Sequence, residues 1–491
     1  MAPDYSKIKN IFLNPLFIMA IGTLLLSIVS FFDIPIGNDE GGWGYIGRAW
    51  ADGQLLPYSG IADNKTPGIF YLNYLSYSLF GTNIWFLRLL ALISTVLTAF
   101  LIYLIGKRIA NSRVAVFSMA IFIFLMPLPA VDGSYAQTET FMNLFVAAAF
   151  YFLISSEAGS KRMLAVFLSG LCLGIAVAFR QSAVISIIPL LFTLSFLKHY
   201  DWKRFFTGAG VFFFGAITAT ALSILPYIFS GGQFTDYLNG AWLFFLRGDV
   251  GVVTGGLIHR LSGFATRFFG PEIFLPASSV LMLCVYFRKM RNSGIYFVVP
   301  LLVWALFDFF SYNLEGTYFP HHLKLLALSW SISFGFVADF FLRKFFEERV
   351  FYGPFVVAAL FVFYVFFQNS YYATARAFMK GASGHDFRDI GAVIKNMTKR
   401  GDTIYAYGLH TGPIYYYSSR NSPSRYFETQ QLAMPGALAE LQANLLEKQP
   451  KIILTSLGET PPPWLQTFVA EHYTAEAPQY GYAIYKNALT E

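Results

Sequence analysis

Residues 11–32 have the sequence IFLNPLFIMAIGTLLLSIVSFF and contain no charged side chain. A transmembrane α-helix needs about 20 consecutive, mostly apolar residues, so this stretch is long enough to cross a bilayer. Similar stretches recur along the chain. About eleven candidate transmembrane helices start near Ile11, Ile84, Val114, Thr138, Met163, Ser182, Phe205, Ile273, Ile295, Leu323 and Phe351. The sequence therefore predicts a polytopic α-helical membrane protein.

The composition supports the same fold class. Of the 491 residues, 56% are apolar, 19% are aromatic and only 13% are charged. A soluble protein carries about 25% charged residues to cover its surface. This deficit excludes a soluble globule, a disordered chain and, despite the net charge of +7, a nucleic-acid-binding domain. Cys172 and Cys284 both lie in apolar runs, so no disulfide framework is expected.

Basic residues concentrate in alternate short loops, which predicts the orientation. They are Lys7, Lys9, Lys107, Arg108, Arg113, Lys161, Arg162, Lys198, Lys203, Arg204, Arg288, Lys289, Arg291, Arg343, Lys344 and Arg349. The opposite loops are longer but hold fewer basic residues. Because cytoplasmic loops carry an excess of Lys and Arg, we expect the N-terminus in the cytoplasm. After an odd number of helices, the chain beyond Gln368 then lies outside.

Two outer loops, residues 33–83 and 230–271, are too long to be simple connectors. Both mix aromatic residues, glycines and charges. Within the first, residues 66–80 have an apolar face interrupted by Asn73 and Ser76, a pattern typical of a helix lying in the membrane interface. Because the inner loops are short, we expect the protein to act at the outer face.

Residues 383–491 have a higher charge density and the pattern of a small α/β unit. Helices are expected at 386–399 and 435–446, and strands at 403–407, 451–455 and 481–485. Strands that alternate with helices predict a small parallel sheet. The segment GLHTG, residues 408–412, lacks the full glycine fingerprint of a phosphate loop, so a plain strand-to-helix turn is favoured. We expect a transmembrane domain at 1–370 and an extracytoplasmic α/β domain at 371–491.

The segment GNDEGGWGY, residues 37–45, follows the first membrane helix and carries two adjacent carboxylates, Asp39 and Glu40. Carboxylates beside lipid are costly and usually serve a water-filled cavity. Alternatively, Asp39 caps the next helix by accepting backbone N–H groups. The residues alone leave both interpretations open.

Two further segments offer charged groups on the outer side. Lys65 lies in DNKTPG, residues 63–68, where its ammonium can meet a phosphate, although a lysine snorkelling to the headgroups is the more common case. Glu139 stands at the start of the fourth apolar helix. It is either a helix-terminal acid favoured by the dipole or a second carboxylate in a shared cavity.

The segment GTYFPHHLK, residues 316–324, places His321, His322 and Lys324 at the outer end of the tenth helix. Together with Arg180, another outer-side cation, these residues suit an anionic ligand. A metal site is disfavoured, because adjacent histidines point apart on a helix and the sequence shows no matching third ligand. Arg88, Arg247, Arg260 and Arg267 are further cations on this side.

Taken in order, these segments resemble the GT-C superfamily of membrane glycosyltransferases, above all the bacterial relatives of protein O-mannosyltransferases and of the lipid A aminoarabinose transferase. NDEG at 38–41, DNKTPGIFYL at 63–72 and QTE at 137–139 match family segments in order and approximate spacing. FPHH at 319–322 is similar to the family's His-Tyr segment. Thr66 stands where the family usually has a proline, and His322 replaces the tyrosine. The likeness covers about the first 345 residues.

The resemblance implies a mechanism and a set of site residues. The catalytic residues would be Asp39, as general base on the acceptor hydroxyl, and Glu139. The donor phosphate would be bound by Lys65, Arg180, His321 and Lys324, with Glu40, Tyr45 and His322 in supporting roles. In-line attack would invert the anomeric centre. No metal ligand is assigned and no cofactor is certain, although a divalent cation would be compatible.

The resemblance also implies the partners and the location. The donor would be a polyprenyl-phosphate sugar, the acceptor a lipid, protein or glycan, and the surroundings membrane lipid, with no nucleic acid. The protein would be a multi-pass protein of the bacterial inner membrane with a periplasmic C-terminus. Two rivals stay open. One is an oligosaccharide ligase or polymerase with a diphosphate-linked donor. The other is a lipid-linked sugar transporter, which should show internal repeats that this sequence lacks.

Overall fold

The computed structural model describes residues 14–31, 36–128, 131–133, 135–156, 161–197, 201–243, 262, 295–315, 319–345, 387–408 and 410–488. The chain forms two compact units whose segments interleave along the sequence. The first unit comprises Met1–Phe32, Arg88–Ser223 and Val253–Lys380, and the second comprises Asp33–Leu87, Ile224–Val252 and Gly381–Glu491. The predicted domain division near residue 370 stays a prediction, since residues 346–386 lie outside the described residues.

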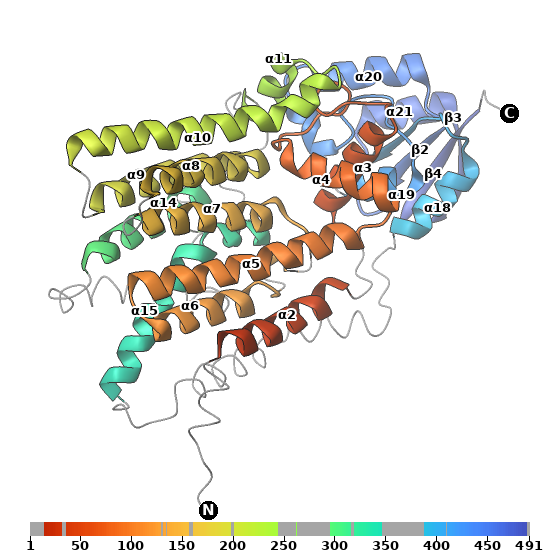
Figure 1. Cartoon of the computed structure of the whole chain (residues 1–491). Coiled ribbons are helices and arrows are strands. Elements are labelled where there is room, and N and C mark those ends of the chain that lie inside the picture. Colours follow the sequence, from red (N-terminus) through yellow and green to blue (C-terminus); the bar gives the residue numbers. More distant parts are fainter. Residues whose placement is uncertain are drawn as a thin grey trace, which may run out of the picture. The chain divides into compact units, whose positions relative to one another are not determined.

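The first unit consists of helices that run side by side (Figure 1). They are α2 (Pro15–Phe31), α5 (Trp85–Ile109) from Arg88 onward, α6 (Ser112–Leu125), α7 (Thr138–Ser155), α8 (Arg162–Phe179), α9 (Ile187–Phe196), α10 (Trp202–Phe229) up to Ser223, α14 (Ile295–Glu315) and α15 (Ala327–Phe345). Two 3₁₀ turns, η3 (Gln181–Ser186) and η6 (Pro320–Leu325), precede α9 and α15.

Small residues allow close packing between these helices. A Cβ atom added to Gly170 of α8 would lie 1.9 Å from the carbonyl oxygen of Phe212 in α10, and one added to Gly174 would lie 2.3 Å from that of Ala216. Gly335 of α15 likewise packs against the backbone of α6 at Val114. Close backbone approach at small residues is a common way for membrane helices to associate.

Within the part of the chain that the structure describes, four helices are long and apolar enough to cross a membrane, by length and composition: α5, α7, α8 and α10. Shorter apolar helices occupy Ser112–Leu125, Gln181–Phe196, Phe297–Asn313 and Ala327–Phe340. The membrane class predicted from the sequence is thereby supported, but eleven spans are not confirmed. The candidate helices expected near Ile273 and Phe351 lie outside the described residues.

The second unit contains α3 (Asn38–Ala51), α4 (Gly68–Phe80), α11 (Phe234–Tyr237) and the π-helical turn η4 (Leu238–Leu243). Its C-terminal part adds four helices and a 3₁₀ turn: α18 (Phe387–Met397), α19 (Gly412–Ser418), η7 (Thr429–Ala433), α20 (Ala437–Lys448) and α21 (Pro463–His472). The sequence suggested a helix after Asp39 only through the capping interpretation and gave it no bounds; in α3, every residue from Glu40 to Trp50 is buried.

A four-stranded sheet completes this unit in the order β1-β2-β4-β3. The strands are β1 (Ile404–Tyr407), β2 (Ile452–Ser456), β3 (Tyr473–Gln479) and β4 (Tyr482–Asn487). Only β1 and β2 are parallel, so the prediction of a parallel sheet was wrong for the other two pairs. Tyr480 and Gly481 both have positive φ and join β3 to β4 in a two-residue hairpin. The predicted strands at 403–407, 451–455 and 481–485 correspond to β1, β2 and β4.

Helix α4 confirms the helix expected at residues 66–80 and has an unusual distribution of polarity. Its polar residues Asn73 and Ser76 are buried, whereas Leu75, Leu79 and Phe80 are exposed. The side-chain amide of Asn73 donates to the carbonyl oxygen of Ile69, 2.9 Å away. An apolar exposed face with polar groups turned inward suits lipid rather than water.

Candidate active site

In the first unit, the central feature is a buried ion pair between Arg180 and Glu139. Arg180 caps the C-terminus of α8, and Glu139 stands in the first turn of α7, where the helix dipole favours a carboxylate. The Arg180 guanidinium binds Glu139 Oε1, and both side chains are at most 2% exposed. Thr138 Oγ1 donates to the second carboxylate oxygen over 3.1 Å, and Arg180 Nε donates to Ser182 Oγ over 3.1 Å.

His321 connects this pair to a second carboxylate. Its Nδ1 lies 3.0 Å from Asp132 Oδ2, and its Nε2 lies 3.9 Å from Glu139 Oε1. Asp132 sits in a left-handed turn, with φ of 50°. His321 thus links the turn at Asp132 to the first turn of α7.

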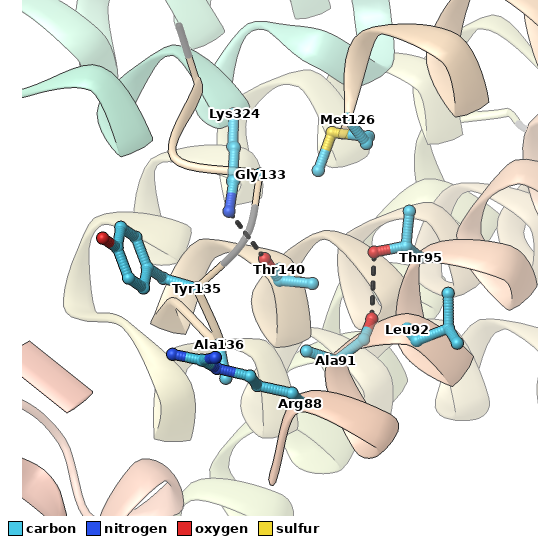
Figure 2. A pocket seen from close by; sticks show the side chains of 10 residues that line it. All are labelled: Arg88, Ala91, Leu92, Thr95, Met126, Gly133, Tyr135, Ala136, Thr140 and Lys324. Atoms are coloured by element: carbon cyan, nitrogen blue, oxygen red, sulfur yellow. Dashed lines mark hydrogen bonds between the residues drawn. The ribbon is translucent and has the colours of Figure 1, made fainter. Parts of the chain in front are cut away.

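Lys324 is fully buried beside these residues. Its ammonium donates to Thr140 Oγ1 at 3.1 Å (Figure 2). It also donates to the carbonyl oxygen of Asp132 at 3.2 Å. Its own carbonyl oxygen accepts from the Asn143 side chain at 2.8 Å. The 3₁₀ turn η6 thus presents His321 and Lys324 to the N-terminal turn of α7.

A small pocket adjoins Lys324. Figure 2 shows Lys324 and Arg88 among its lining side chains, with Tyr135 and Thr140 between them. Arg88 is buried, and its guanidinium carbon lies 5.7 Å from the centre of the Tyr135 ring. Two cations at one pocket give it a positive potential, which favours an anionic ligand.

A divalent cation has a candidate site in this cluster. Glu139, His321 and His322 are all buried, and one ligand atom from each lies within 4.8 Å of the others. One carboxylate and two imidazoles form a donor set typical of Zn²⁺. Glu139 is thus a possible third ligand, one that was not evident from the sequence. The ion pair with Arg180 competes for the same carboxylate.

The second unit holds Asp39, Glu40, Tyr45 and Lys65, the remaining candidates. At the N-terminus of α3, the backbone N–H of Gly37 donates to the Glu40 carboxylate at 3.4 Å, so Glu40 helps to cap this helix. Tyr45 is fully buried and its ring stacks on Tyr415 with the centroids 5.0 Å apart. Burial raises the pKa of Tyr45 to about 12, so its hydroxyl stays neutral.

Asp39 belongs to a group of carboxylates that the sequence did not reveal. Asp63 Oδ1 accepts the backbone N–H of Lys65 at 2.8 Å. Burial raises the pKa of Asp63 to about 6, a rise that Lys65 opposes and Asp39 reinforces. The third carboxylate, Glu428, comes from the C-terminal segment and has no local motif to mark it. Burial, and then the charges of Asp63 and Asp39, raise its pKa to about 8.

A known protein family matches part of the chain. Residues 64–228, about a third of the chain, match the family model described as dolichyl-phosphate-mannose-protein mannosyltransferase. None of the curated protein sequences matches the chain.

Solved structures share the fold over almost the whole chain. ArnT from Cupriavidus metallidurans bound to undecaprenyl phosphate is 13% identical, with a TM-score of 0.62 over 97% of this chain and 98% of its own. The same protein in the apo state gives a TM-score of 0.64 at 13% identity, and the match covers 96% of this chain and 97% of that protein. The archaeal oligosaccharyltransferase AglB from Archaeoglobus fulgidus, in complex with an inhibitory peptide and a dolichol-phosphate, is 12% identical. Its TM-score is 0.60, and the match covers 97% of this chain and 74% of AglB. These likenesses confirm the GT-C resemblance at the level of the fold.

Proposed function

We propose that the protein is a glycosyltransferase that moves a sugar from a polyprenyl-phosphate-linked donor to an acceptor hydroxyl or phosphate at the outer face of the membrane. The main observation in support of this proposal is the buried group of Arg180, Glu139, His321 and Lys324 in a GT-C fold. Similar solved proteins bind undecaprenyl phosphate or dolichol-phosphate. Buried cations on apolar helices suit the phosphate of such a lipid.

In this proposal, the cations of the first unit bind the donor. Arg180, His321 and Lys324 hold the phosphate and stabilise the charge that develops on it as the sugar leaves. Lys65 of the second unit has the same assigned role. Glu139 orients Arg180 through their ion pair and neutralises the site while no donor is bound.

Asp39 is the proposed general base. The acceptor oxygen attacks the anomeric carbon and passes its proton to the Asp39 carboxylate. The bond between the anomeric carbon and the phosphate oxygen breaks, and its electron pair stays with the phosphate, so polyprenyl phosphate is released. Attack from the side opposite the phosphate inverts the anomeric centre. A lipid-phosphate donor is already activated, so the reaction needs no soluble nucleotide sugar.

If a divalent cation were bound by Glu139, His321 and His322, it would replace the Glu139–Arg180 ion pair and the contact of His321 with the phosphate, and would itself supply Lewis-acid stabilisation of phosphate charge. Chelation with EDTA during the transfer assay tests whether the reaction depends on it. The topology completes the proposal: an inner-membrane protein with a cytoplasmic N-terminus, a periplasmic C-terminus, and a lipid, protein or glycan as acceptor.

The proposal is tested with purified protein in liposomes that contain a panel of radiolabelled lipid-linked sugars. The protein should release label from monophosphate-linked donors and leave diphosphate-linked donors unchanged. Consumption of diphosphate-linked donors alone would instead indicate a ligase or polymerase. Movement of intact donor between leaflets, without cleavage, would indicate a transporter.

A further inference from the structure

The C-terminal segment contacts the start of helix α3 through backbone packing. A Cβ atom on Gly41 would lie 2.4 Å from the backbone nitrogen of Pro413, and one on Gly412 would lie 2.5 Å from that of Gly42. The two backbone segments approach so closely that only glycine fits at positions 41 and 412. The first turn of α3, which carries Asp39, is therefore held in place by the start of α19.

Asn38 and Glu428 add polar contacts to this packing. The Asn38 side chain accepts the backbone N–H of Gly412 at 3.4 Å and donates through Nδ2 to Glu428 Oε1 at 3.2 Å. A Cβ atom on Gly42 would lie 3.2 Å from the same Glu428 oxygen. The Glu428 carboxyl group thus lies directly against the turn that contains Asp39.

The segment around Glu428 also contacts the loop that carries Asp63. The side-chain amide of Gln431 donates to the carbonyl oxygen of Ala62 at 2.8 Å, while its Oε1 accepts the backbone N–H of Phe427 at 3.0 Å. The backbone N–H of Ala62 donates to the carbonyl oxygen of Arg425 at 2.9 Å. These contacts bring Glu428, Asp63 and Asp39 into one group.

We propose that Glu428, supplied by the C-terminal segment, is a positioning residue that holds Asp39 in place, and that it does so while it is protonated. This inference rests on the proposed function, since it assigns the C-terminal α/β part a role in the transfer reaction. Glu428 does not itself take the acceptor proton; it acts through the first turn of α3.

The charges around Glu428 explain why its protonation state affects the position of Asp39. It faces Asp39 on α3 and Asp63 on the neighbouring loop, where Lys65 is the cation next to Asp63. With its pKa raised to about 8, Glu428 keeps its proton at neutral pH. Ionised Glu428 would add a negative charge to a group that already holds two carboxylates, and like charges at this range repel. The turn that carries Asp39 would then shift.

The first test compares the pH profiles of the transfer rate for the wild type and Glu428→Gln, which imitates the protonated acid. A group with a pKa of about 8 is about nine-tenths protonated at pH 7 and about one-tenth at pH 9, so the wild-type rate should fall about tenfold between them. Glu428→Gln should match the wild type at pH 7 and lose this fall. Glu447→Gln, on an exposed glutamate of α20, is the matched control and should keep the wild-type profile.

The second test separates positioning from general structural damage. Glu428→Ala should lower kcat at least about tenfold at pH 7 with an unchanged KM for the donor, and Glu428→Gln should rescue it. In addition, the thermal unfolding temperature should depend less on pH between 5 and 9 in Glu428→Gln than in the wild type, a readout that needs no activity. An alanine variant with wild-type kcat, or a glutamine variant that keeps the tenfold fall, would overturn the inference. A wild type that consumes no donor would instead refute the proposed function.

Discussion

The Glu139–Arg180 ion pair makes a quantitative prediction, because both side chains are at most 2% exposed. Replacing Glu139 by glutamine leaves the Arg180 guanidinium buried without its counter-charge. Removal of one partner of a buried pair costs about 3–5 kcal/mol, whereas replacement of both partners by uncharged groups is often nearly neutral. We therefore expect Glu139→Gln and Arg180→Met each to destabilise the protein by several kcal/mol, and the double variant to recover most of that loss.

The assay is a double-mutant cycle on the unfolding midpoint of the purified protein in mixed micelles titrated with SDS. The control is Asp201→Asn, which breaks the exposed pair with Arg204, whose side chains are 60% and 64% exposed. An exposed pair contributes at most about 1 kcal/mol. If Glu139→Gln costs no more than Asp201→Asn, or if the double variant costs the sum of the two single ones, the buried pair does not have the role described above.

Three further predictions concern other parts of the structure. Because the folded-state pKa of Asp63, about 6, exceeds the ordinary value, stability is lost as pH rises from about 4 to 6. Asp63→Asn should remove this loss and be about 3 kcal/mol more stable than the wild type at pH 8 but not at pH 4, as unfolding midpoints at the two pH values will show. Gly41→Ala should destabilise the protein by about 1–3 kcal/mol, since its Cβ would meet the backbone of Pro413. Gly210→Ala, whose Cβ would have no atom within 4 Å, should leave stability unchanged or raise it. Equal unfolding midpoints for the two variants would contradict this. Lys324→Met should raise KM for the donor about 10- to 100-fold through loss of a charged hydrogen-bond donor, and an unchanged KM in the transfer assay would argue against phosphate binding there.

The membrane class could be predicted from the sequence because hydrophobicity is a property of each segment by itself. Helices α7 and α8 start at or next to the positions expected from their apolar runs, near Thr138 and Met163. The strands β1, β2 and β4 also lie where β-branched and aromatic residues predict them. A local sequence pattern predicted an element correctly where the apolar residues of that element determine its burial.

The extent of helix α3 could not be predicted, because its stability comes from distant contacts. Its segment has four glycines between positions 41 and 47, and glycine costs about 1 kcal/mol per residue in a helix. The helix forms because Gly41 and Gly42 admit the backbone at Pro413 and Gly412, far along the chain, while Gly47 admits the backbone of α4 at Asn73. Strand β3 was missed for the opposite reason: six of its seven residues are exposed, so it lacks the apolar alternation that marks a strand.

In the candidate site, too, the residues brought in by distant contacts could not be predicted from the sequence. Glu139, Arg180, His321 and Lys324 were recognisable as unusual charges beside apolar runs, and the structure brings these four together. Glu428 carries no such mark, because the charged segment around it looks like any solvated surface. Its contact with Asn38 joins residues 390 positions apart, which no periodicity predicts.

The central claim, that this protein transfers sugar from a polyprenyl phosphate with Asp39 as the base, is tested most directly by one comparison. Membranes with the wild type, Asp39→Asn or the control Asp389→Asn, an exposed acid of α18, receive radiolabelled polyprenyl-phosphate sugars. Label should leave the polyprenyl-phosphate fraction with the wild type and the control, and stay with Asp39→Asn. Label that stays with all three, or leaves equally with Asp39→Asn, would contradict the claim.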